Sequence, residues 1–476
     1  AMEALPTVTR GSEEDEAYER REGLLQAKER GEGGEEEDDR EPQGPLRLIG
    51  MNSFFFAYGC YISSFGIVTL PTESERFFPQ YHDLALASFL AIAGLSQLSG
   101  PTAGFFSDRY VSRHGRRRPL LAMGALVALP SIFVMWLARS YPAAGWAPTT
   151  YFAAFFLAMM ALNTMYSSCA GLIPDLVPEA ELGKANGIMA AMTALGACMG
   201  FLFIFNFPDT AALYKLYVGL MCTTVPLTLV ASREKPALAE HPPWEWSEIT
   251  SSYWIDANAH PDFFYLFLCR MCYYCGVSVQ VFVKFWMRDI VVDKDGHSFT
   301  TEESAKYTAD IGFIIQVFGA LGAYPSGLLS DLTGRKPLVA ISCFGIIAVY
   351  ICFCFMDHLG QLLWMGTVYG LWNGMYLSVD YALAVDCLPS KEESARWLAV
   401  WSVACFLGTT IGPLVSGPVL FIFSVPPDPD AGPDAPHRTS HNGYRAIMLI
   451  GAVWMALSAA LLVMIKKGGR PARNQL

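Results

Sequence analysis

Apolar residues along this chain gather in twelve runs that are separated by polar segments. A helix of about 20 apolar residues is long enough to cross a hydrocarbon core ~30 Å thick. The first six expected spans cover residues 47–70, 84–106, 119–138, 150–173, 185–206 and 212–231. The second six cover residues 263–286, 309–330, 337–356, 360–384, 397–423 and 444–465. The pattern therefore predicts an all-α membrane protein with twelve transmembrane helices.

Polar segments before, between and after the two sets of spans divide the chain further. Residues 1–46 contain the acidic block Glu35–Asp39 and too few apolar residues to form a core, so we expect a disordered tail there. The remaining division is a six-helix bundle at 47–231, a central linker at 232–262, a second six-helix bundle at 263–466 and a short tail at 467–476.

Composition narrows the possible functions. Hydrophobic residues make up 53% of the chain and charged residues 16%, which is too little charge for a soluble protein of this length. The net charge of −11 argues against a nucleic-acid partner, because phosphate binding needs a basic face. Cys269, Cys272 and Cys275 are spaced like metal ligands, but no fourth ligand is nearby, so we interpret them as packing residues. We expect neither a metal nor a cofactor.

Lysine and arginine are unevenly divided between the two sets of loops. The loops and tail on one side hold sixteen of these residues, five of them within Arg109–Arg118, and the opposite loops hold eight. Basic residues concentrate on the cytoplasmic side of membrane proteins. We therefore expect both termini in the cytoplasm, with the protein in the plasma membrane or an organelle membrane.

The two sets of spans share a duplicated series of motifs. Each contains a Gly-x-x-x-Asp loop that leads to a basic segment, an Asn-x-Met-Tyr segment inside a span, and an Asp-x-x-Pro segment after that span. The corresponding pairs are Asp108 and Asp331, Asn163 and Asn373, and Asp175 and Asp386, at offsets of 223, 210 and 211 residues. Three matches in the same order are hard to obtain by chance, so we infer an internal duplication.

The loop motif resembles the best-known signature of the major facilitator superfamily. The segment from Arg113 to Pro119 is also similar to a loop of the sucrose–proton symporters, a branch of the glycoside–pentoside–hexuronide:cation symporters. The resemblance implies two pseudo-symmetric six-helix bundles that open a central site alternately to the two sides of the membrane. It further implies a cytoplasmic gate formed by Gly104, Asp108, Arg109, Gly115, Arg116, Arg117, Asp175, Gly327, Asp331, Gly334, Arg335, Lys336 and Asp386. The alternative is that the arginines only set topology, which would require neither the glycines nor the aspartates.

In this fold, the first helix of each three-helix repeat lines the central cavity. These helices correspond to the expected spans at 47–70, 150–173, 263–286 and 360–384, which carry polar and aromatic side chains at mid-depth. As substrate-binding candidates we take Tyr58, Tyr61, Asn163, Tyr166, Arg270, Tyr274, Gln280, Asn373 and Tyr376. Hydroxyls and amides can hydrogen-bond a sugar while aromatic rings stack on its apolar faces. A helix-packing role is the alternative for any one of these residues.

Two charges inside expected spans, Arg270 and Asp380, lie at similar depth. A charge at mid-membrane costs ~2.5–3.5 kcal/mol on insertion scales, so such residues are functional candidates. The position that matches Asp380 in the first half is Ala170, so the carboxylate belongs to one half only. We expect Asp380 to couple transport to protons by alternating between paired and unpaired states. The alternative is a permanent structural pair with Arg270.

The function that these observations favour is secondary active transport of a small polar solute, as a proton-coupled symporter for a disaccharide-like sugar. The expected partners are this solute, protons and membrane lipid, and the expected state is a monomer. An enzyme is not expected, because no His lies at mid-depth in a span. Direct ATP use is not expected either, because the sequence has no Gly-x-x-x-x-Gly-Lys-Ser/Thr phosphate-binding loop. The alternatives are transport or export of a non-sugar metabolite, and a membrane sensor that does not transport.

Overall fold

The computed structural model describes residues 42–108, 110, 112–178, 181–234, 236, 255–390, 394–426 and 436–466. Nearly all of the expected N-terminal tail, most of the expected linker and the whole expected C-terminal tail at 467–476 lie outside these ranges. The described chain is helical apart from short connections and one two-stranded hairpin, β1 (Ser424–Val425) with β2 (Arg438–Thr439).

The first half of the chain forms six spans after a short helix. Its elements are α2 (Pro45–Met51), α3 (Ser53–Ser64), η1 (Phe65–Thr69), α4 (Leu70–Phe77), α5 (His82–Ser96), α6 (Ser99–Asp108), α7 (Arg118–Arg139), α8 (Ala147–Leu176), α9 (Leu182–Asn206) and α10 (Thr210–Ala231). The elements α3, η1 and α4 form one continuous span. The helices α5 and α6 follow each other with a short break between them and make up the second span.

The second half repeats this plan. Its elements are α12 (Pro261–Val277), η3 (Ser278–Phe282), α13 (Val283–Asp289), α14 (Thr301–Thr333), α15 (Arg335–Phe353), α16 (Leu359–Cys387), α17 (Ser394–Ile422), α18 (His441–Leu461) and η5 (Leu462–Met464). Ten helical segments are long and apolar enough to cross a membrane. The pair α5–α6 and the 29-residue α16 add two, so the described residues contain twelve spans. The predicted all-α membrane fold is confirmed.

The first span differs from its predicted limits of 47–70. The chain breaks at Asn52, whose side chain donates to the Leu48 carbonyl, so the residues before it form the separate helix α2. The span continues seven residues past the predicted end, through the polar turn that holds Glu73 and Glu75. Hydropathy alone excluded this turn, but Arg139 and Lys284 supply opposite charges to these carboxylates and make their burial tolerable.

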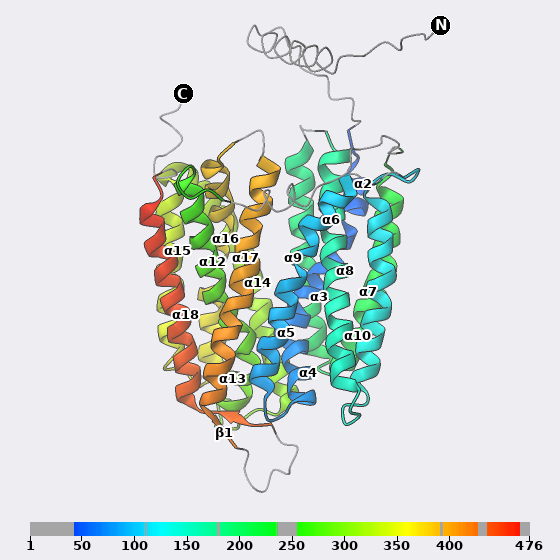
Figure 1. The fold of residues 1–476 in the computed structure, drawn as a ribbon. Helices are drawn as coiled ribbons and strands as arrows, with labels where there is room; N and C mark the ends of the chain where they lie inside the picture. Colours follow the sequence, from blue (N-terminus) through cyan, green and yellow to red (C-terminus); the bar gives the residue numbers. More distant parts are fainter. Residues whose placement is uncertain are drawn as a thin grey trace, which may run out of the picture.

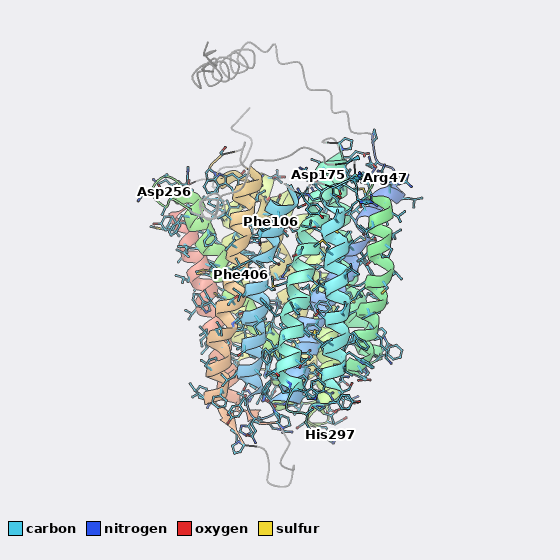
Figure 2. The ribbon with its side chains drawn as sticks, turned by 45° about the vertical axis from the view of Figure 1, so that its right-hand side comes forward. Arg47, Phe106, Asp175, Asp256, His297 and Phe406 are labelled. Atoms are coloured by element: carbon cyan, nitrogen blue, oxygen red, sulfur yellow. The ribbon has the colours of Figure 1, made fainter. Side chains whose placement is uncertain are left out.

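The spans stand side by side as a bundle with two distinct ends (Figure 1). We call the upper end the one that holds α2, Asp175 and Asp256, and the lower end the one that holds α4, α13 and His297 (Figure 2). Packing is mainly within each half: α3 packs against α9 and α10, α7 against α8, α14 against α16, and α12 against α17 and α18. The main contacts between the halves are those of α5 with α17 and of α9 with α14.

Glycines allow helices to approach closely within each half. A Cβ at Gly59 of α3 would clash with the Thr193 carbonyl of α9, and a Cβ at Gly374 of α16 would clash with the Gly319 carbonyl of α14. Small residues at helix interfaces are a main source of packing energy in lipid, where the hydrophobic effect does not drive helices together. These contacts make each half a tightly packed unit, so that a site can form between the two halves.

Candidate functional site

A buried ion pair joins α12 to α16. Arg270 Nη1 pairs with Asp380 Oδ2. The Asp380 side chain is fully buried, and the Arg270 side chain is 11% exposed. An unpaired charge at this place would cost several kcal/mol, so each residue makes the burial of the other tolerable. The structure therefore brings together the two intramembrane charges that the sequence singled out.

Aromatic rings hold the Arg270 guanidinium on two sides. Its Cζ atom lies 3.4 Å from the ring centroid of Trp401 and 5.0 Å from that of Tyr274. Arg270 Nη2 also donates to the Tyr274 hydroxyl at 3.4 Å, and Tyr274 lies beside Cys405 of α17. Cation–π contacts contribute from ~0.5 kcal/mol to ~2 kcal/mol when they are desolvated. Arg270 is thus fixed by α12, α16 and α17 together.

Asp380 uses one of its two carboxylate oxygens. Oδ2 binds Arg270, whereas Oδ1 is buried and has no hydrogen-bond partner among the described residues. A buried acceptor without a donor costs about 1–3 kcal/mol. A proton can therefore add at Oδ1 without displacing the bond that Oδ2 makes with Arg270.

Two stacked tyrosines lie beside this pair inside the second half. The rings of Tyr273 and Tyr376 are parallel, with centroids 3.4 Å apart, and both are buried. The Tyr273 hydroxyl donates to Asn373 Oδ1 at 2.5 Å. Asn373 and Tyr376, which the sequence placed in the cavity wall, thus bind neighbours within their own half in this conformation.

A cavity of about 310 Å³ lies between the halves. Its walls are Tyr58, Tyr61, Ile62, Phe65, Gly66, Leu70, Leu90, Ala93, Gly94, Gln97, Phe155, Met159 and Asn163 of the first half, with Cys405 and Thr409 of the second. The Tyr58 hydroxyl donates to Asn163 Oδ1 at 3.4 Å, and Asn163 Nδ2 donates to Ser96 Oγ at 3.0 Å. The cavity therefore offers hydroxyl and amide groups in an otherwise aromatic and aliphatic wall.

The candidate residues are distributed unevenly around this cavity. Tyr58, Tyr61 and Asn163 line it, and the Tyr166 ring packs at a tilt against Tyr58 with ring centroids 4.7 Å apart. Gln280 lies elsewhere, in a separate apolar pocket within the second half.

Cys405 lies between the cavity and the ion pair, because it lines the cavity and lies beside the Tyr274 that contacts Arg270. Sequence reasoning missed Cys405, Thr409 and Trp401 because it looked for cavity residues on four other spans. A tryptophan beside a small polar stretch in residues 397–423 was the available signal.

Basic and acidic residues join the loops of the first half at the upper end. Arg116 Nη2 lies 2.6 Å from Asp175 Oδ1, and Arg117 Nε lies 3.1 Å from Asp175 Oδ2. The Glu234 carboxylate, which the sequence analysis did not single out, accepts the backbone N–H groups of Arg117 and Arg118 at 2.9–3.2 Å. An anion at the N-terminus of a helix is favourable, so Glu234 caps α7.

The second half repeats the arrangement. Arg335 Nη1 lies 2.6 Å from Asp386 Oδ1 and donates to the Ala382 carbonyl at 2.5 Å. Asp331 Oδ1 lies 3.9 Å from Arg335 Nη2. Lys336 Nζ donates to the Ile465 carbonyl at 2.6 Å.

Two glycines turn the chain into the basic segments. Gly115 has φ +90° and Gly334 has φ +92°, a region that residues with a Cβ rarely adopt. Gly327, in the preceding loop motif, packs close enough to α16 that an added Cβ would lie 3.3 Å from Ser378 Oγ. Of the other expected gate residues, Gly104 lies in α6, whereas Arg109 and the side chain of Asp108 lie outside the described residues. The gating role of this set stays a prediction.

Buried charges join the two halves at the lower end. Glu75 of α4 pairs with Lys284 and, at 2.7 Å, with Arg288, both on α13. Arg288 Nη2 donates to the His437 carbonyl, and the His437 N–H donates to the Pro79 carbonyl. Above these bonds, α5 stays against α17 as far as Gly94 and Thr410, whereas α6 packs against α8 of its own half. The halves are thus locked together at the lower end.

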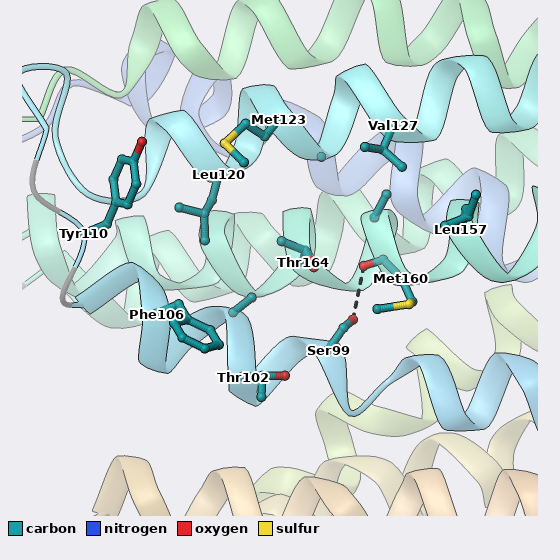
Figure 3. A pocket seen from close by; sticks show the side chains of 13 residues that line it. Ser99, Thr102, Phe106, Tyr110, Leu120, Met123, Val127, Leu157, Met160 and Thr164 are labelled. Carbon is teal, nitrogen blue, oxygen red and sulfur yellow. Dashed lines mark hydrogen bonds between the residues drawn. The ribbon is translucent and has the colours of Figure 1, made fainter. Parts of the chain in front are cut away.

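A larger pocket of about 530 Å³ lies on one half alone (Figure 3). It is formed by α6, α7 and α8, and its walls are apolar side chains such as Phe106, Met123 and Leu157, which are about half exposed. The Ser99 hydroxyl is already bonded to the Met160 carbonyl at 3.1 Å. Because this surface is apolar and does not reach the second half, we do not assign it to the transported solute.

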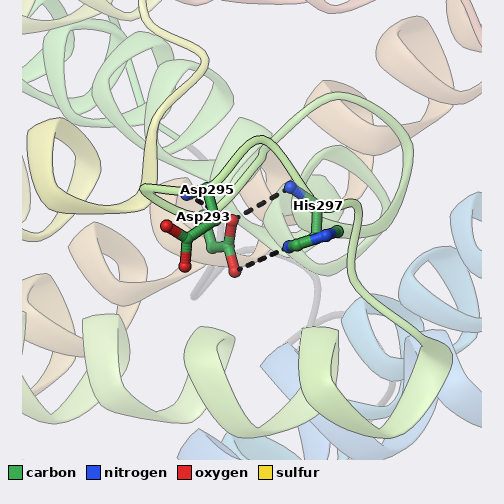
Figure 4. Close-up of side chains that lie close together, drawn as sticks. All are labelled: Asp293, Asp295 and His297. Atoms are coloured by element: carbon green, nitrogen blue, oxygen red, sulfur yellow. Dashed lines mark hydrogen bonds and ion pairs between the residues drawn. The ribbon is translucent and has the colours of Figure 1, made fainter.

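Three possible metal ligands gather in the loop between α13 and α14 (Figure 4). Ligand atoms of Asp293, Asp295 and His297 lie within 4.8 Å of one another. Asp293 Oδ1 accepts the N–H groups of Asp295 and His297, and the bond from His297 lowers the pKa of Asp293. Hydrogen bonding within an exposed turn explains this cluster fully, so it gives no ground for a metal.

Comparison with known proteins identifies the family. The model of the Major Facilitator Superfamily matches residues 19–238 and 266–475. A stretch of 240 residues is 28% identical to the general alpha-glucoside permease of Schizosaccharomyces pombe, over 43% of this chain and 42% of that protein. A stretch of 134 residues is 27% identical to the sucrose transport protein SUT1 of Oryza sativa subsp. japonica, over 25% of each protein.

A third relative is named as an efflux pump. The efflux pump azaK of Aspergillus niger is 28% identical over 116 residues, which are 23% of this chain and 24% of that protein. All three matches span less than half the length of the relatives. They therefore leave the branch of the family open.

Solved structures share the fold. A bacterial homologue of the human lysosomal transporter Spinster, in an inward-facing and unoccupied conformation, has a TM-score of 0.65 at 15% identity, over 90% of this chain and 98% of that one. The nucleoside transporter NupG has a TM-score of 0.64 at 15% identity, over 89% and 100%. With the family model matched across both halves, this chain belongs to the Major Facilitator Superfamily.

Proposed function

We propose that this transporter carries a disaccharide-like sugar together with protons by alternating access. The observation that carries the proposal is the buried Arg270–Asp380 pair, which is linked through Tyr274 and Cys405 to the cavity between the halves. Asp380 supplies the carboxylate of this site from one half, whereas Ala170 occupies the matching position in the other. Such asymmetry fits a coupling group better than a symmetric scaffold.

The chemistry of the cavity supports a polyol. Tyr58 and Asn163 present groups that donate and accept hydrogen bonds, and Phe65 and Phe155 present rings that can stack on the apolar face of a sugar ring. A volume of about 310 Å³ suits a small solute. The partial likeness to an alpha-glucoside permease and to a sucrose transport protein points to the same class of solute.

The state of the two ends supports alternating access. Basic residues are concentrated in the loops of the upper end, so we assign this end to the cytoplasm. The buried charge network then closes the opposite side, and the conformation is one that opens inward. The ion pairs of Asp175 and Asp386, each within one half, would rearrange when the upper end closes.

Protonation of Asp380 provides a way to couple the two fluxes. A proton on Oδ1 neutralises the carboxylate and weakens its attraction for Arg270, which frees guanidinium donors to bind a solute hydroxyl. Solute binding in turn favours the protonated form, because each ligand must change the affinity of the other by the same factor.

Flux through purified protein in proteoliposomes tests the proposal. Labelled sucrose and maltose are supplied to vesicles whose outside is more acidic, whose inside is more acidic, or that have no pH gradient. Each condition is measured with and without a protonophore. Accumulation that needs outside acid and disappears with the protonophore is the expected result. Uptake that needs inside acid would instead indicate proton-driven export, which the likeness to an efflux pump makes the main competitor. Substrate binding with no flux in any gradient would indicate a sensor.

A further inference from the structure

The lower end holds an unbalanced group of buried charges where the two halves meet. Three acidic side chains, Glu75, Asp83 and Asp289, face two basic ones, Lys284 and Arg288, and each is at most 5% exposed. Three negative charges against two positive ones leave one negative charge without a partner. A buried and uncompensated charge is strongly unfavourable, so this closed arrangement needs one more positive charge.

Four of the five charges are accounted for by direct contacts. Glu75 takes both Lys284 and Arg288. Arg288 Nε also lies 2.7 Å from Asp289 Oδ1, while Asp289 Oδ2 accepts from the Tyr444 hydroxyl at 2.7 Å and from a backbone N–H of β2 at 2.9 Å. The residue left over is Asp83, at the start of α5.

The group beside Asp83 is an imidazole in an unusual position. His82 Nε2 lies 3.6 Å from Asp83 Oδ1, and neither atom has a hydrogen-bond partner among the described residues. His82 Nδ1 lies 3.0 Å from the Pro79 carbonyl, which can only accept, so Nδ1 carries a proton. In neutral imidazole, Nε2 would then turn a lone pair toward a carboxylate. One added proton changes this contact from repulsive to attractive.

Among the described residues, no lysine or arginine forms an ion pair with Asp83. α4 contributes Glu75, α13 contributes Arg288, Asp289 and the Phe285 ring, which meets the His82 ring edge-on at 4.5 Å, and α18 contributes Tyr444. The hairpin contributes Thr439, while the neighbouring Arg438 is exposed to solvent. The residue before β2 is the partly buried His437, whose N–H donates to the Pro79 carbonyl and whose Nδ1 has no hydrogen-bond partner among the described residues. From α17, the uncharged Gly417 packs close to the Asp83 backbone.

We infer that His82 and Asp83 together bind one proton when the lower end is closed, as a proton site separate from Asp380. Proton binding there makes the buried group neutral and stabilises the closed lower end. When the halves separate, water reaches the pair and compensates the charge, so the proton is no longer required. Closure is therefore favoured by acid at the lower face. The inference rests on alternating access but on neither the sugar nor Asp380.

Distance measurements between spin labels in the substrate-free, full-length protein test this directly. Gly145, in the loop after α7, and Gly360, at the start of α16, are exposed, lie at the lower end in opposite halves and have no atom within 4 Å of an added Cβ. The label pair is introduced there after the accessible cysteines are replaced by serine. In nanodiscs, the closed-to-open ratio should fall with rising pH, by up to about tenfold per pH unit as for a single proton.

Asp83→Asn mimics the protonated acid and should hold the closed state across the whole pH range. His82→Gln removes the base and should shift the transition by at least about one pH unit. The matched control is His297→Gln, a histidine at the same end whose side chain is 80% exposed, which should keep the wild-type profile. A wild-type pH profile in both Asp83→Asn and His82→Gln would overturn the inference, and if Asp83→Asn does not fold, the profile of His82→Gln alone decides. Because no solute is present, the outcome is independent of whether the protein carries sugar.

Discussion

The Arg270 guanidinium lies against the face of the Trp401 indole, with Cζ 3.4 Å from the ring centroid. This contact ties α12 to α17 at the point where Arg270 also pairs with Asp380 of α16. Three helices of the second half thus converge on one cation. A cation held by a ring as well as by an acid can remain buried when the acid is neutralised, which is what a reversible proton site requires.

Replacing the ring should therefore weaken the site in a graded way. We expect Trp401→Ala to lower the free energy of unfolding by about 3 kcal/mol or more, because it removes both the packing and the cation–π contact. Trp401→Phe keeps a ring over Arg270 and should recover much of the loss. Thermal unfolding of the purified variants measures this. Equal losses in the Ala and Phe variants would show that the stacked ring does not support Arg270.

Glu234 should stabilise the upper end of the first half. It caps α7 by accepting two backbone N–H groups, and a charged cap of this kind contributes about 1–2 kcal/mol. We expect Glu234→Ala to lower the unfolding temperature and Glu234→Gln to have a smaller effect, since its amide oxygen can still accept. Unfolding of Glu234→Ala at the wild-type temperature would contradict the assignment.

The ion pairs at the upper end should control the rate of the conformational change. Arg335→Asp breaks the contact with Asp386, and we expect exchange of labelled solute to slow by about tenfold if the pair is worth ~1.4 kcal/mol in the rate-limiting state. The double variant Arg335→Asp/Asp386→Arg restores opposite charges and should recover part of the rate. Arg113→Gln, which changes an exposed arginine of the corresponding loop, is the control. No recovery in the double variant would argue against a role for the pair itself.

Accessibility should distinguish the cavity from the small apolar pocket. Asn163→Cys places a thiol in the cavity wall, where we expect a small hydrophilic thiol reagent to react and the transported solute to protect. Gln280→Cys lies in the pocket of the second half that is lined by apolar side chains, and should react far more slowly. Both variants need a background without reactive native thiols. Equal reaction rates at the two positions would place the aqueous path elsewhere.

Much of the fold could be predicted from the sequence because membrane spans have a strong local signature. The duplicated motifs located Asp175 and Asp386, and the cost of intramembrane charge singled out Arg270 and Asp380. The buried charges that join the halves at the lower end could not be predicted. The partners Glu75 and Lys284 are more than two hundred residues apart, and hydropathy placed Glu75 in a loop. Trp401 and Cys405 were missed because cavity residues were expected on four other spans, so the tryptophan beside a small polar stretch in residues 397–423 was not used.

The central claim is that Asp380 binds the coupled proton, and Asp380→Asn tests it most directly. The variant is reconstituted into proteoliposomes, and gradient-driven accumulation and solute exchange at equal pH are measured on the same preparation. The account predicts that accumulation is lost while exchange survives, because the neutral amide mimics the protonated acid and exchange needs no net proton release. Accumulation that still responds to the pH gradient as in the wild type would contradict it, as would the joint loss of accumulation, exchange and folding that a purely structural pair predicts.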